Sequence, residues 1–496
     1  MTTLEPDIDP SLAALADAVL IPPFYGTTPP DWILDALGRG LAGVTLFGNN
    51  VTGDISQLTT SLRTAASAEP VIAIDEEGGD VTRVDYAEGS PYPGNAALGV
   101  VDDVEMTREV YAAMGADLRR LGINTNLAPC ADVLAAGGSP VIGTRSFGAD
   151  PKLVARHVAA AVEGLQKAGV AACAKHFPGH GSTSADSHRV LATISGSLEE
   201  IRRRDLPPFE AAIAAGTWSL MPGHLRVPEL TGDLPATLSA AAVTGLLRGE
   251  LGFSGTVICD ALEMKAASAI FGIPEAAVLA VIAGVDLLCL GRDTDEEMYH
   301  AIRTALAEAV TSGRLAASRL EEAASRVASL RARLGEARRD GEEPGGWAGP
   351  ATDGIGLIAA RRALYGSGPI PARLSDPLII EVEPEENIAA GRFTWGFSHW
   401  SAVRRIDPAD ASGSGLDGAA LSEILYAAAG RSLVLAVRDA TGALPLVTGL
   451  LSARPDMIIV EMGVPTWNPP EGTAYLATYG ASRACAMAAA EALGLA

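Results

Sequence analysis

The segment PKLVARHVAAAVEGLQKAGVAACAKHF (residues 151–177) joins an amphipathic stretch of helical length to a short and almost wholly apolar run. Pro151 begins the first part and Gly169 ends it, which are the positions that proline and glycine favour at the two ends of a helix. The run AACAKHF (171–177) is too short for a helix. Such continuous apolarity is typical of a strand buried on both faces of a parallel sheet. The segment therefore predicts one helix-and-strand unit of a parallel α/β fold.

Further apolar runs on either side share the length and character of this one. They are AVLIPPF (18–24), AGVTLFG (42–48), VIAID (71–75), INTNLAP (123–129), WSLMPGH (218–224), TVICDAL (256–262) and VDLLCLG (285–291). Longer amphipathic segments, such as 102–122 and 293–313, lie between most of them. Eight strands that alternate with helices over about 250 residues or more predict a (β/α)8 barrel. An open doubly wound sheet is the alternative, although the GxGxxG turn that usually follows its first strand is absent here.

The barrel pattern stops near Leu334, and a second domain is expected beyond it. We predict a barrel domain at residues 1–335, a linker rich in glycine, proline and charge at 336–354, and a C-terminal domain at 355–496. Further strand-like runs and an alanine-rich helix follow at 377–383, 432–439, 456–463 and 482–495. About 140 residues suffice for a smaller α/β domain.

The composition limits the partners and the cellular location that we expect. The formal net charge of the 496 residues is −23, and such a surface repels nucleic acid and anionic membranes. The N-terminal residues lack the basic start and apolar core of a signal peptide, and no apolar run reaches the roughly 18 residues that span a bilayer. The five cysteines form no CxxC pair and lie mostly in or beside apolar runs. We therefore expect a cytoplasmic protein with reduced thiols; its oligomeric state stays open.

Ionisable residues stand at the ends of several predicted strands. Asp75 ends the third strand, Lys175 and His176 end the fifth, His224 ends the sixth, and Asp260 lies at the end of the seventh. The carboxyl ends of the strands form the active-site face of a (β/α)8 barrel. A single aspartate there would be explained as a helix cap, but ionisable groups on several strands predict a catalytic site.

The segment KHFPGHGSTSADSH (175–188) is predicted as a strand end followed by a loop, because its glycines and proline disfavour a helix. Asp186 and His188 are two residues apart, so a turn can bring the carboxylate to one imidazole nitrogen while the other gives a proton to a leaving group. A surface hydrogen bond between the two is the alternative. A metal site is a further alternative for the histidines, namely His176, His180, His188 and His224. Because the first strand lacks the HxH pair of metal-dependent barrel hydrolases, we expect neither a metal ion nor another cofactor.

These motifs resemble glycoside hydrolase family 3, in particular its β-N-acetylhexosaminidase branch. KHFPGHGSTSADSH is similar to the long signature of that branch. Further motifs match in the same order, namely IDEEGG (74–79) followed by Arg83, GINTNLAP (122–129), IGTRSFG (142–148) and ICDALEM (258–264). The resemblance extends over residues 15–335, and the tail looks like the family's second domain. It implies a TIM barrel followed by a smaller α/β sandwich domain.

The resemblance also implies roles for individual residues. Asp260 stands at the position of the nucleophile, and His188 at that of the acid/base with Asp186 as its partner. The sugar-binding positions are those of Asp75, Arg83, Arg145, Lys175 and His176. For His180 and His224, ligand contact and structural support stay open, and Glu76 and Glu77 are expected at the rim. An ion pair that braces the rim is the structural alternative for Arg145, and burial against Asp75 is the alternative for Lys175 and His176.

The activity that follows is that of a retaining exo-β-N-acetylglucosaminidase. In this interpretation Asp260 attacks the anomeric carbon while His188 protonates the leaving oxygen, and water then hydrolyses the glycosyl-aspartate. Muropeptides, as in cell-wall recycling, and chitin fragments are the substrates that we consider. Three alternatives remain: transfer of the sugar to phosphate or another acceptor, a glucose or xylose substrate, and carbohydrate binding without catalysis. Two residues depart from the family pattern, which often has Arg or Lys at the position of Asp80 and Asp at that of Ser182.

Overall fold

The computed structural model describes residues 8–496 apart from 136–138, 140, 184–190, 195, 340–353, 375, 384–388, 392–395 and 413–417, with the backbone alone at 270 and 418–420. The chain forms two compact units. The first, here called the barrel unit, comprises Met1–Glu76, Thr107–Ile142 and Ala149–Ala348. The second, the sandwich unit, comprises Glu77–Met106, Gly143–Gly148 and Gly349–Ala496.

The barrel unit is built on a parallel sheet of six strands. In spatial order the strands are β2 (Gly43–Leu46), β3 (Val71–Ile74), β4 (Thr125–Asn126), β5 (Ala171–Phe177), β7 (Ser219–Pro222) and β9 (Thr256–Val257). Every residue of these strands is buried. Burial on both faces explains why the runs are apolar throughout rather than alternating.

A parallel pair of strands, β1 (Leu20–Ile21) and β10 (Leu288–Cys289), closes this sheet into a ring. On one side, Ile258 just after β9 bridges Leu287 just before β10. On the other, the N–H of Thr45 on β2 donates to the carbonyl of Pro22 just after β1. Within the described residues, each of the eight predicted strand runs thus supplies one strand of a closed barrel. The (β/α)8 prediction is confirmed, and the open sheet is excluded.

Helices alternate with the strands of the barrel unit. They are α1 (Pro10–Asp17), α2 (Asp31–Arg39), α3 (Ile55–Ala65), α5 (Val104–Arg120), α6 (Pro151–Lys167), α7 (Leu198–Arg204), α8 (Pro207–Ala214), α9 (Pro228–Thr231), α10 (Lys265–Phe271), α11 (Ile273–Ala283), α12 (Glu296–Thr311) and α13 (Ala317–Arg339). Shorter elements are the 3-10 turn η2 (Ala236–Leu238), the π-helix η3 (Ala241–Glu250) and the pair β6 (Ala192–Thr193) and β8 (Leu225–Arg226). In the part of the chain that the structure describes, no helix combines the length and apolarity needed to cross a bilayer.

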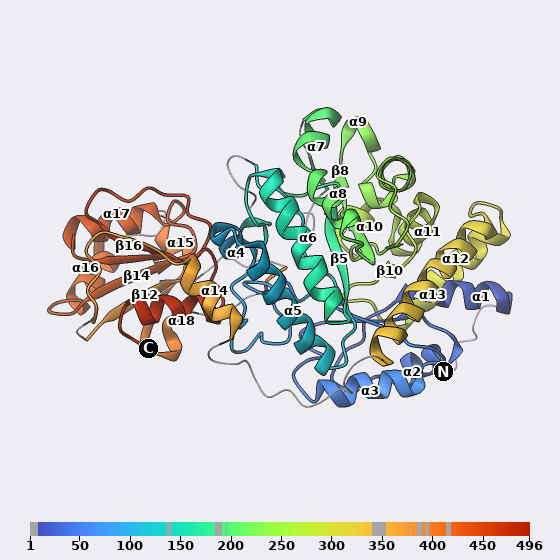
Figure 1. Cartoon of the computed structure of the whole chain (residues 1–496), viewed down its shortest axis with the longest axis horizontal. Coiled ribbons are helices and arrows are strands. Elements are labelled where there is room, and N and C mark those ends of the chain that lie inside the picture. The colour runs from blue at the N-terminus through green and yellow to red at the C-terminus, as the bar shows by residue number, and fades with distance from the viewer. Residues whose placement is uncertain are drawn as a thin grey trace. The chain divides into compact units, whose positions relative to one another are not determined.

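Helix α6 begins at the predicted residue, Pro151, and ends two residues before the predicted end, Gly169. The Asp150 side chain accepts a hydrogen bond from the N–H of Lys152, Pro151 occupies the first turn, and Gly169 beyond the last turn has a φ of +80°. Gly164 lets α6 lie directly against α5, because a Cβ at this position would come within 2.4 Å of the Arg108 carbonyl oxygen. The two helices run side by side in Figure 1.

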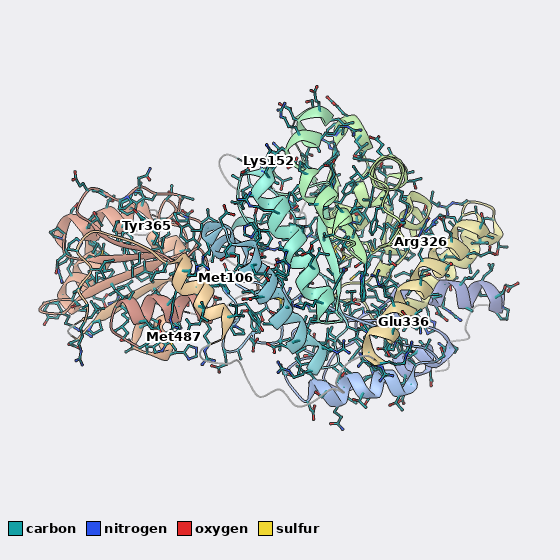
Figure 2. The ribbon with its side chains drawn as sticks, viewed as in Figure 1. Met106, Lys152, Arg326, Glu336, Tyr365 and Met487 are labelled. Atoms are coloured by element: carbon teal, nitrogen blue, oxygen red, sulfur yellow. The ribbon has the colours of Figure 1, made fainter. Side chains whose placement is uncertain are left out.

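The amino end of the barrel strands is braced by ion pairs. Asp286, two residues before β10, is fully buried and binds three guanidinium groups. Arg319 Nη2 lies at 2.6 Å and Arg326 Nη1 at 3.3 Å, and Arg248 also pairs with this carboxylate. Arg326 is labelled on α13 in Figure 2. These ion pairs hold helices against the amino end of the barrel, the end that contributes to stability in this fold.

The sandwich unit contains a six-stranded sheet. The order is β11 (Tyr365–Ser367), β16 (Ala474–Ala477), β15 (Ile458–Glu461), β14 (Leu433–Val437), β12 (Leu378–Val382) and β13 (Val403–Ile406). All neighbours are parallel except the antiparallel edge pair β11–β16. The predicted runs correspond to β12, β14 and β15. The edge strands β11 and β13 are largely solvent-accessible and therefore lack the apolar signal that marks the central strands.

Helices cover both faces of this sheet (Figure 1). Ile424 of α16 (Gly418–Ala427) and Leu446 and Leu450 of α17 (Leu444–Ala453) pack on one face. Ala486 and Ala489 of α18 (Arg483–Ala492) pack on the other. The remaining helical elements of the unit are α4 (Asn95–Val101), η1 (Gly143–Arg145), α14 (Ile355–Ala363), η4 (Phe397–His399) and α15 (Pro408–Ala411). The predicted α/β sandwich is confirmed.

The sandwich unit is not one continuous segment. It includes residues 77–106 and 143–148, two loops that follow barrel strands in the sequence. Helix α13 continues to Arg339, four residues into the predicted linker, and residues 340–353 of that linker lie outside the described part of the chain. The unit that contains the C-terminus therefore also includes two segments from the first half of the sequence.

Candidate active site

Asp75 and Lys175 form an ion pair at the carboxyl end of the barrel strands. Asp75 follows β3 directly and Lys175 lies in β5, two strands away across the ring. Lys175 Nζ is 2.5 Å from Asp75 Oδ1. The lysine side chain is only 3% exposed, whereas that of the aspartate is 24% exposed. The structure thus joins two of the predicted sugar-binding residues and leaves the carboxylate accessible from solvent.

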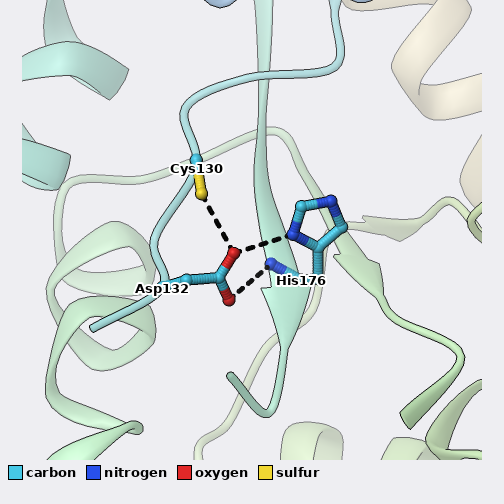
Figure 3. Close-up of side chains that lie close together, drawn as sticks. All are labelled: Cys130, Asp132 and His176. Atoms are coloured by element: carbon cyan, nitrogen blue, oxygen red, sulfur yellow. Dashed lines mark hydrogen bonds and ion pairs between the residues drawn. The ribbon is translucent and has the colours of Figure 1, made fainter. Parts of the chain in front are cut away.

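Asp132 organises the end of β5. Its Oδ2 accepts hydrogen bonds from Cys130 Sγ at 2.9 Å and from His176 Nδ1 at 2.8 Å (Figure 3). Its Oδ1 accepts from the backbone N–H groups of His176 at 3.3 Å and His180 at 2.6 Å. Burial favours the neutral form of Asp132, but interaction with His176 and His180 outweighs burial and lowers the pKa of this carboxyl. Because a carboxylate can only accept, Nδ1 of His176 carries the proton and the orientation of the ring is set.

The same three residues have the spacing of a metal site. The ligand atoms of Cys130, Asp132 and His176 lie within 4.8 Å of one another, and all three residues are buried. In this network, however, the Cys130 thiol and His176 Nδ1–H both donate to the carboxylate. A cation would have to displace both protons, since metal ligands bind deprotonated. Hydrogen bonding that orients His176 accounts for the arrangement.

The loop after β5 is anchored at its stem. Gly179 lies so close to the buried Asp205 that a Cβ would come within 2.7 Å of its side chain. Arg204 Nη2 donates to the Ser182 hydroxyl at 2.9 Å and also to Asp205. Burial raises the pKa of Asp205 to about 6, against the opposing effect of Arg204. Ser182, one of the two departures from the family pattern, is therefore a contact of the stem.

His180 belongs to this buried stem. Its ring lies 5.8 Å from that of His176 at an interplanar angle of 78°, and its Nδ1 is 2.5 Å from Thr183 Oγ1. These contacts belong to the loop stem, and ligand contact by His180 stays a prediction. The predicted acid/base His188 and its partner Asp186 fall within residues 184–190, outside the described residues. Their roles stay predictions.

Asp260 lies at the carboxyl end of β9 and is half-buried. Its Oδ1 accepts a hydrogen bond from the N–H of Ala261 at 2.8 Å. His224, which follows β7 and is fully buried, has its Nε2 3.0 Å from the Ala261 carbonyl oxygen. A carbonyl can only accept, so Nε2 of His224 carries the proton. His224 therefore holds the carbonyl of Ala261, the residue after Asp260, and ligand contact by His224 stays a prediction.

Asp75 and Asp260 act on a common buried group. Cys173 on β5 is fully buried, and the loss of hydration raises the pKa of its thiol to about 12. The charges of Asp75 and Asp260 act in the same direction, while Ser219 and Lys175 oppose them. Asp75 follows β3, Lys175 lies in β5 and Asp260 follows β9, so all three stand toward the carboxyl end of the barrel strands.

Glu263 is a mostly buried carboxyl group three residues after Asp260. Its side chain fills the space above Gly291, where a Cβ would lie 1.3 Å from Glu263 Oε1, so glycine at position 291 makes room for it. Burial, and then the charge of Asp260, raise the pKa of Glu263 to about 7, although the backbone N–H groups of Glu263 and Gly291 oppose this rise. A substantial fraction of the molecules therefore carries a proton here at neutral pH.

Glu263→Gln should change how stability depends on pH. The pKa of Glu263 in the folded state, about 7, lies above its ordinary value of 4.5, so the folded chain binds this proton more tightly than the unfolded chain does. The wild type should therefore lose stability relative to the variant as pH rises from 4.5 to 7, by up to about 3 kcal/mol. Denaturant unfolding at pH 5 and pH 8 measures this difference. The exposed residue Glu297 supplies the control Glu297→Gln. If the free energies of unfolding of wild type and Glu263→Gln differ by the same amount at both pH values, the prediction is contradicted.

The two predicted sugar-binding arginines belong to the sandwich unit. Arg145 in η1 makes a two-point ion pair with Glu77, with Nε 2.8 Å from Oε2 and Nη2 2.7 Å from Oε1. Both side chains are buried, and Asn95 Nδ2 donates to the Arg145 carbonyl at 2.7 Å. Arg83 Nη2 donates to the Ala389 carbonyl at 2.8 Å. The ion pair considered as an alternative for Arg145 is therefore present. Sugar contact stays a prediction for both arginines.

Sequence reasoning did not single out two residues of this region. Asp132 comes three residues after the predicted strand 123–129, and a charged residue just past a buried run is the same signal that pointed to Asp75. Glu263 lies inside the ICDALEM motif, but the sequence contains no sign that Gly291 would receive its side chain. Glu77 was expected at the rim without a partner, and the structure supplies Arg145.

Comparisons with known proteins agree with these observations. The family model "Glycosyl hydrolase family 3 N terminal domain" matches residues 32–330. Among similar proteins, Beta-hexosaminidase A of Pseudoalteromonas piscicida is 34% identical over 336 residues, which cover 62% of this chain and 56% of that protein. A Beta-hexosaminidase of Stenotrophomonas maltophilia is 35% identical over 282 residues, covering 55% of this chain and 82% of that protein. The chain thus spans little more than half the length of the first relative and most of the second.

A solved structure extends the similarity to both units. It is that of a glycoside hydrolase family 3 β-N-acetylglucosaminidase from Paenibacillus, which is 29% identical with a TM-score of 0.84. The match covers 99% of this chain and 96% of that one. The family model covers more than half of the chain, including most of the barrel strands and the five motifs that carry the resemblance. The chain therefore belongs to glycosyl hydrolase family 3.

Proposed function

We propose that the chain is a retaining exo-β-N-acetylglucosaminidase that removes terminal β-linked N-acetylglucosamine. The observation that carries this proposal is that Asp260 follows β9 toward the same carboxyl end of the barrel strands at which Asp75 and Lys175 form their ion pair, with its Oδ1 bound by the N–H of Ala261. A fixed, half-buried carboxylate beside sugar-binding groups is the arrangement that a retaining glycosidase requires. The names of the similar proteins, β-hexosaminidases and a β-N-acetylglucosaminidase, support the choice of sugar.

The proposed reaction has two steps. In the first, an Asp260 oxygen attacks the anomeric carbon, the bond to the leaving oxygen breaks, and His188 gives that oxygen a proton. In the second, His188 takes a proton from water, the water oxygen attacks the same carbon, and Asp260 leaves as a carboxylate. Two inversions at one carbon retain the β configuration.

Sugar recognition is assigned to the groups around Asp260. The accessible carboxylate of Asp75 accepts hydrogen bonds from sugar hydroxyls, and Lys175 Nζ, held at 2.5 Å from it, donates to a neighbouring oxygen. The Asp132–His176 hydrogen bond at 2.8 Å sets the direction of the His176 ring, which adds a further polar contact. Such preorganisation reduces the entropy that binding would otherwise cost.

The cellular compartment and the donor substrates are proposed from the state of the thiols and the charge of the chain. All five cysteines are buried and none forms a disulfide, which suits a reducing compartment such as the cytoplasm. A neutral amino sugar at the non-reducing end of a muropeptide or chitin fragment carries no charge to be repelled by a chain with a net charge of −23. Both are proposed as donor classes.

One assay tests the proposed function. Aryl β-N-acetylglucosaminide, β-glucoside and β-xyloside are compared side by side, each with and without inorganic phosphate. We expect fastest release from the N-acetylglucosaminide, free sugar as the product in both conditions, and the β anomer as the first product seen by NMR. Formation of a sugar phosphate would instead establish phosphorolysis. An α anomer as first product would exclude the double displacement, and binding without turnover of any substrate would exclude an enzyme.

A further inference from the structure

Asp80 stands where the family often has a basic residue, and in this chain it is the centre of a buried contact. Its Oδ1 lies 3.2 Å from Arg438 Nη1 and accepts a hydrogen bond from the N–H of Ala481 at 2.9 Å. Arg438 directly follows β14, and Ala481 precedes α18. The side chain of Asp80 is 11% exposed and that of Arg438 is 18% exposed. The C-terminal sheet of the sandwich unit thus holds this carboxylate from two elements.

The other oxygen of Asp80 is linked to the segment that carries Arg145. Thr144 Oγ1 donates to Asp80 Oδ2 at 2.8 Å, and Thr144 immediately precedes Arg145 in η1. Asp80 itself lies in a tight turn that the Glu77 N–H closes by donating to the Val81 carbonyl at 3.0 Å. Since Glu77 is the partner of Arg145, both halves of that ion pair are tied to Asp80.

Arg83 is held by the same part of the chain through a different contact. Its Nη2 donates to the Ala389 carbonyl at 2.8 Å. Ala389 and Ala390 form a buried apolar cluster with Val81. Of the two arginines at predicted sugar-binding positions, Arg83 is thus held directly by a residue beyond 349, and Arg145 is linked to Arg438 through Thr144 and Asp80.

Electrostatics favour an aspartate rather than a basic residue at position 80. Burial lowers the pKa of Arg438, and the neighbouring Asp80 opposes this by stabilising the charged guanidinium. A second cation at position 80 would leave two buried positive charges together, which is strongly unfavourable. The negative charge of Asp80 thus complements the positive charge of Arg438, a residue at the end of β14 in the C-terminal sheet.

We propose that the C-terminal half of the sandwich unit serves the reaction as a positioning device, in which Arg438 acts through Asp80 to hold the turn at 77–83 and the segment 143–148 with their arginines. Arg438 is a positioning residue in this scheme and does not touch the substrate. The link to sugar binding rests on the proposed function together with the sugar-binding roles predicted for Arg83 and Arg145, whereas the link between Arg438 and the two segments stands on the contacts alone.

Arg438→Met, Asp80→Asn and the double variant test the proposal by kinetics with an aryl β-N-acetylglucosaminide. Each single change should lower kcat/KM by about tenfold or more, with KM rising more than kcat falls, because substrate binding is weakened. The double variant should be no worse than the more damaging single one, since both act through one contact. Arg361→Met is the matched control: it removes the Arg361–Glu491 ion pair of the same unit and should leave kcat/KM unchanged.

Hydrogen exchange separates this inference from the proposed function. In Arg438→Met the amides of residues 77–86 and 143–148 should exchange faster, with those of β14 and β15 unchanged, whereas Arg361→Met should change neither segment. Asp80→Asn provides a milder variant should Arg438→Met unfold. Unchanged exchange in both segments would overturn the positioning role, whatever the activity. Faster exchange with wild-type kcat/KM would overturn its connection to sugar binding. An inactive wild type would refute the proposed function, and the exchange result would still decide whether Arg438 holds the loops.

Discussion

Asp260→Asn is expected to reduce kcat for an aryl β-N-acetylglucosaminide by roughly 10³- to 10⁵-fold. An amide oxygen is a poor nucleophile and carries no charge to stabilise the oxocarbenium-like transition state. The fold should be unaffected, because the amide oxygen can still accept the Ala261 N–H that now binds Oδ1 at 2.8 Å. Turnover measured beside thermal unfolding checks both halves of this expectation. Wild-type turnover in the variant would remove Asp260 from the mechanism.

Two further measurements test which residue is the nucleophile and which is the acid. A 2-fluoro sugar with a good leaving group should accumulate as an ester on Asp260, and peptide mass spectrometry should find it there rather than on Glu263, the buried carboxyl three residues away.

His188→Ala, by contrast, should lose far less activity on substrates with acidic leaving groups, since these depart without a proton. Equal losses on good and poor leaving groups would contradict the acid role of His188.

Asp132→Ala is expected to have the second largest effect, by destabilising the protein by about 3–5 kcal/mol and removing most activity. The carboxylate is fully buried and accepts four hydrogen bonds, from Cys130 Sγ, His176 Nδ1 and the backbone of His176 and His180. Alanine would leave these donors buried without an acceptor, and each such group costs about 1–3 kcal/mol. Denaturant unfolding with parallel measurement of kcat tests both effects.

Two milder variants distinguish loss of support from general damage. Cys130→Ala removes one weak donor and should cost about 1 kcal/mol, with activity kept. Asp132→Asn keeps the volume but not the charge that favours the His176 Nδ1–H bond, so it should lower activity more than stability. If Asp132→Ala unfolds at the same denaturant concentration as the wild type, the hydrogen bonds around residue 132 do not support the site.

The predicted and observed barrels agree because the signal was local. A strand covered on both faces must be apolar along its whole length, so runs such as VIAID and AACAKHF mark buried strands without knowledge of their neighbours. Helix α6 was predicted to within two residues because proline and glycine act on the backbone of their own residues. The edge strands β11 and β13 were missed for the same reason: exposed strands need no apolar run.

The candidate site was predicted in part. Asp75, which directly follows β3, and Asp260, three residues after β9, were singled out by the rule that strand ends share one face of a barrel. The roles of His180 and His224 could not be chosen from the sequence, because their partners, Thr183 and the Ala261 carbonyl, are set by how loops fold. The loop with Asp186 and His188 lies outside the described residues, so that part of the site stays a prediction.

The order of strands and helices, the barrel, and the strand ends that carry ionisable groups could all be predicted from the residues alone. These follow from periodicity and from backbone preferences, which act over a few residues. The pairs of residues that meet became known from the fold: Glu77 pairs with Arg145, Asp80 pairs with Arg438, and Glu263 packs on Gly291, over 68, 358 and 28 positions of sequence. Ion pairs and close packing depend on distance in space, and no local pattern of residues encodes a partner that far along the chain.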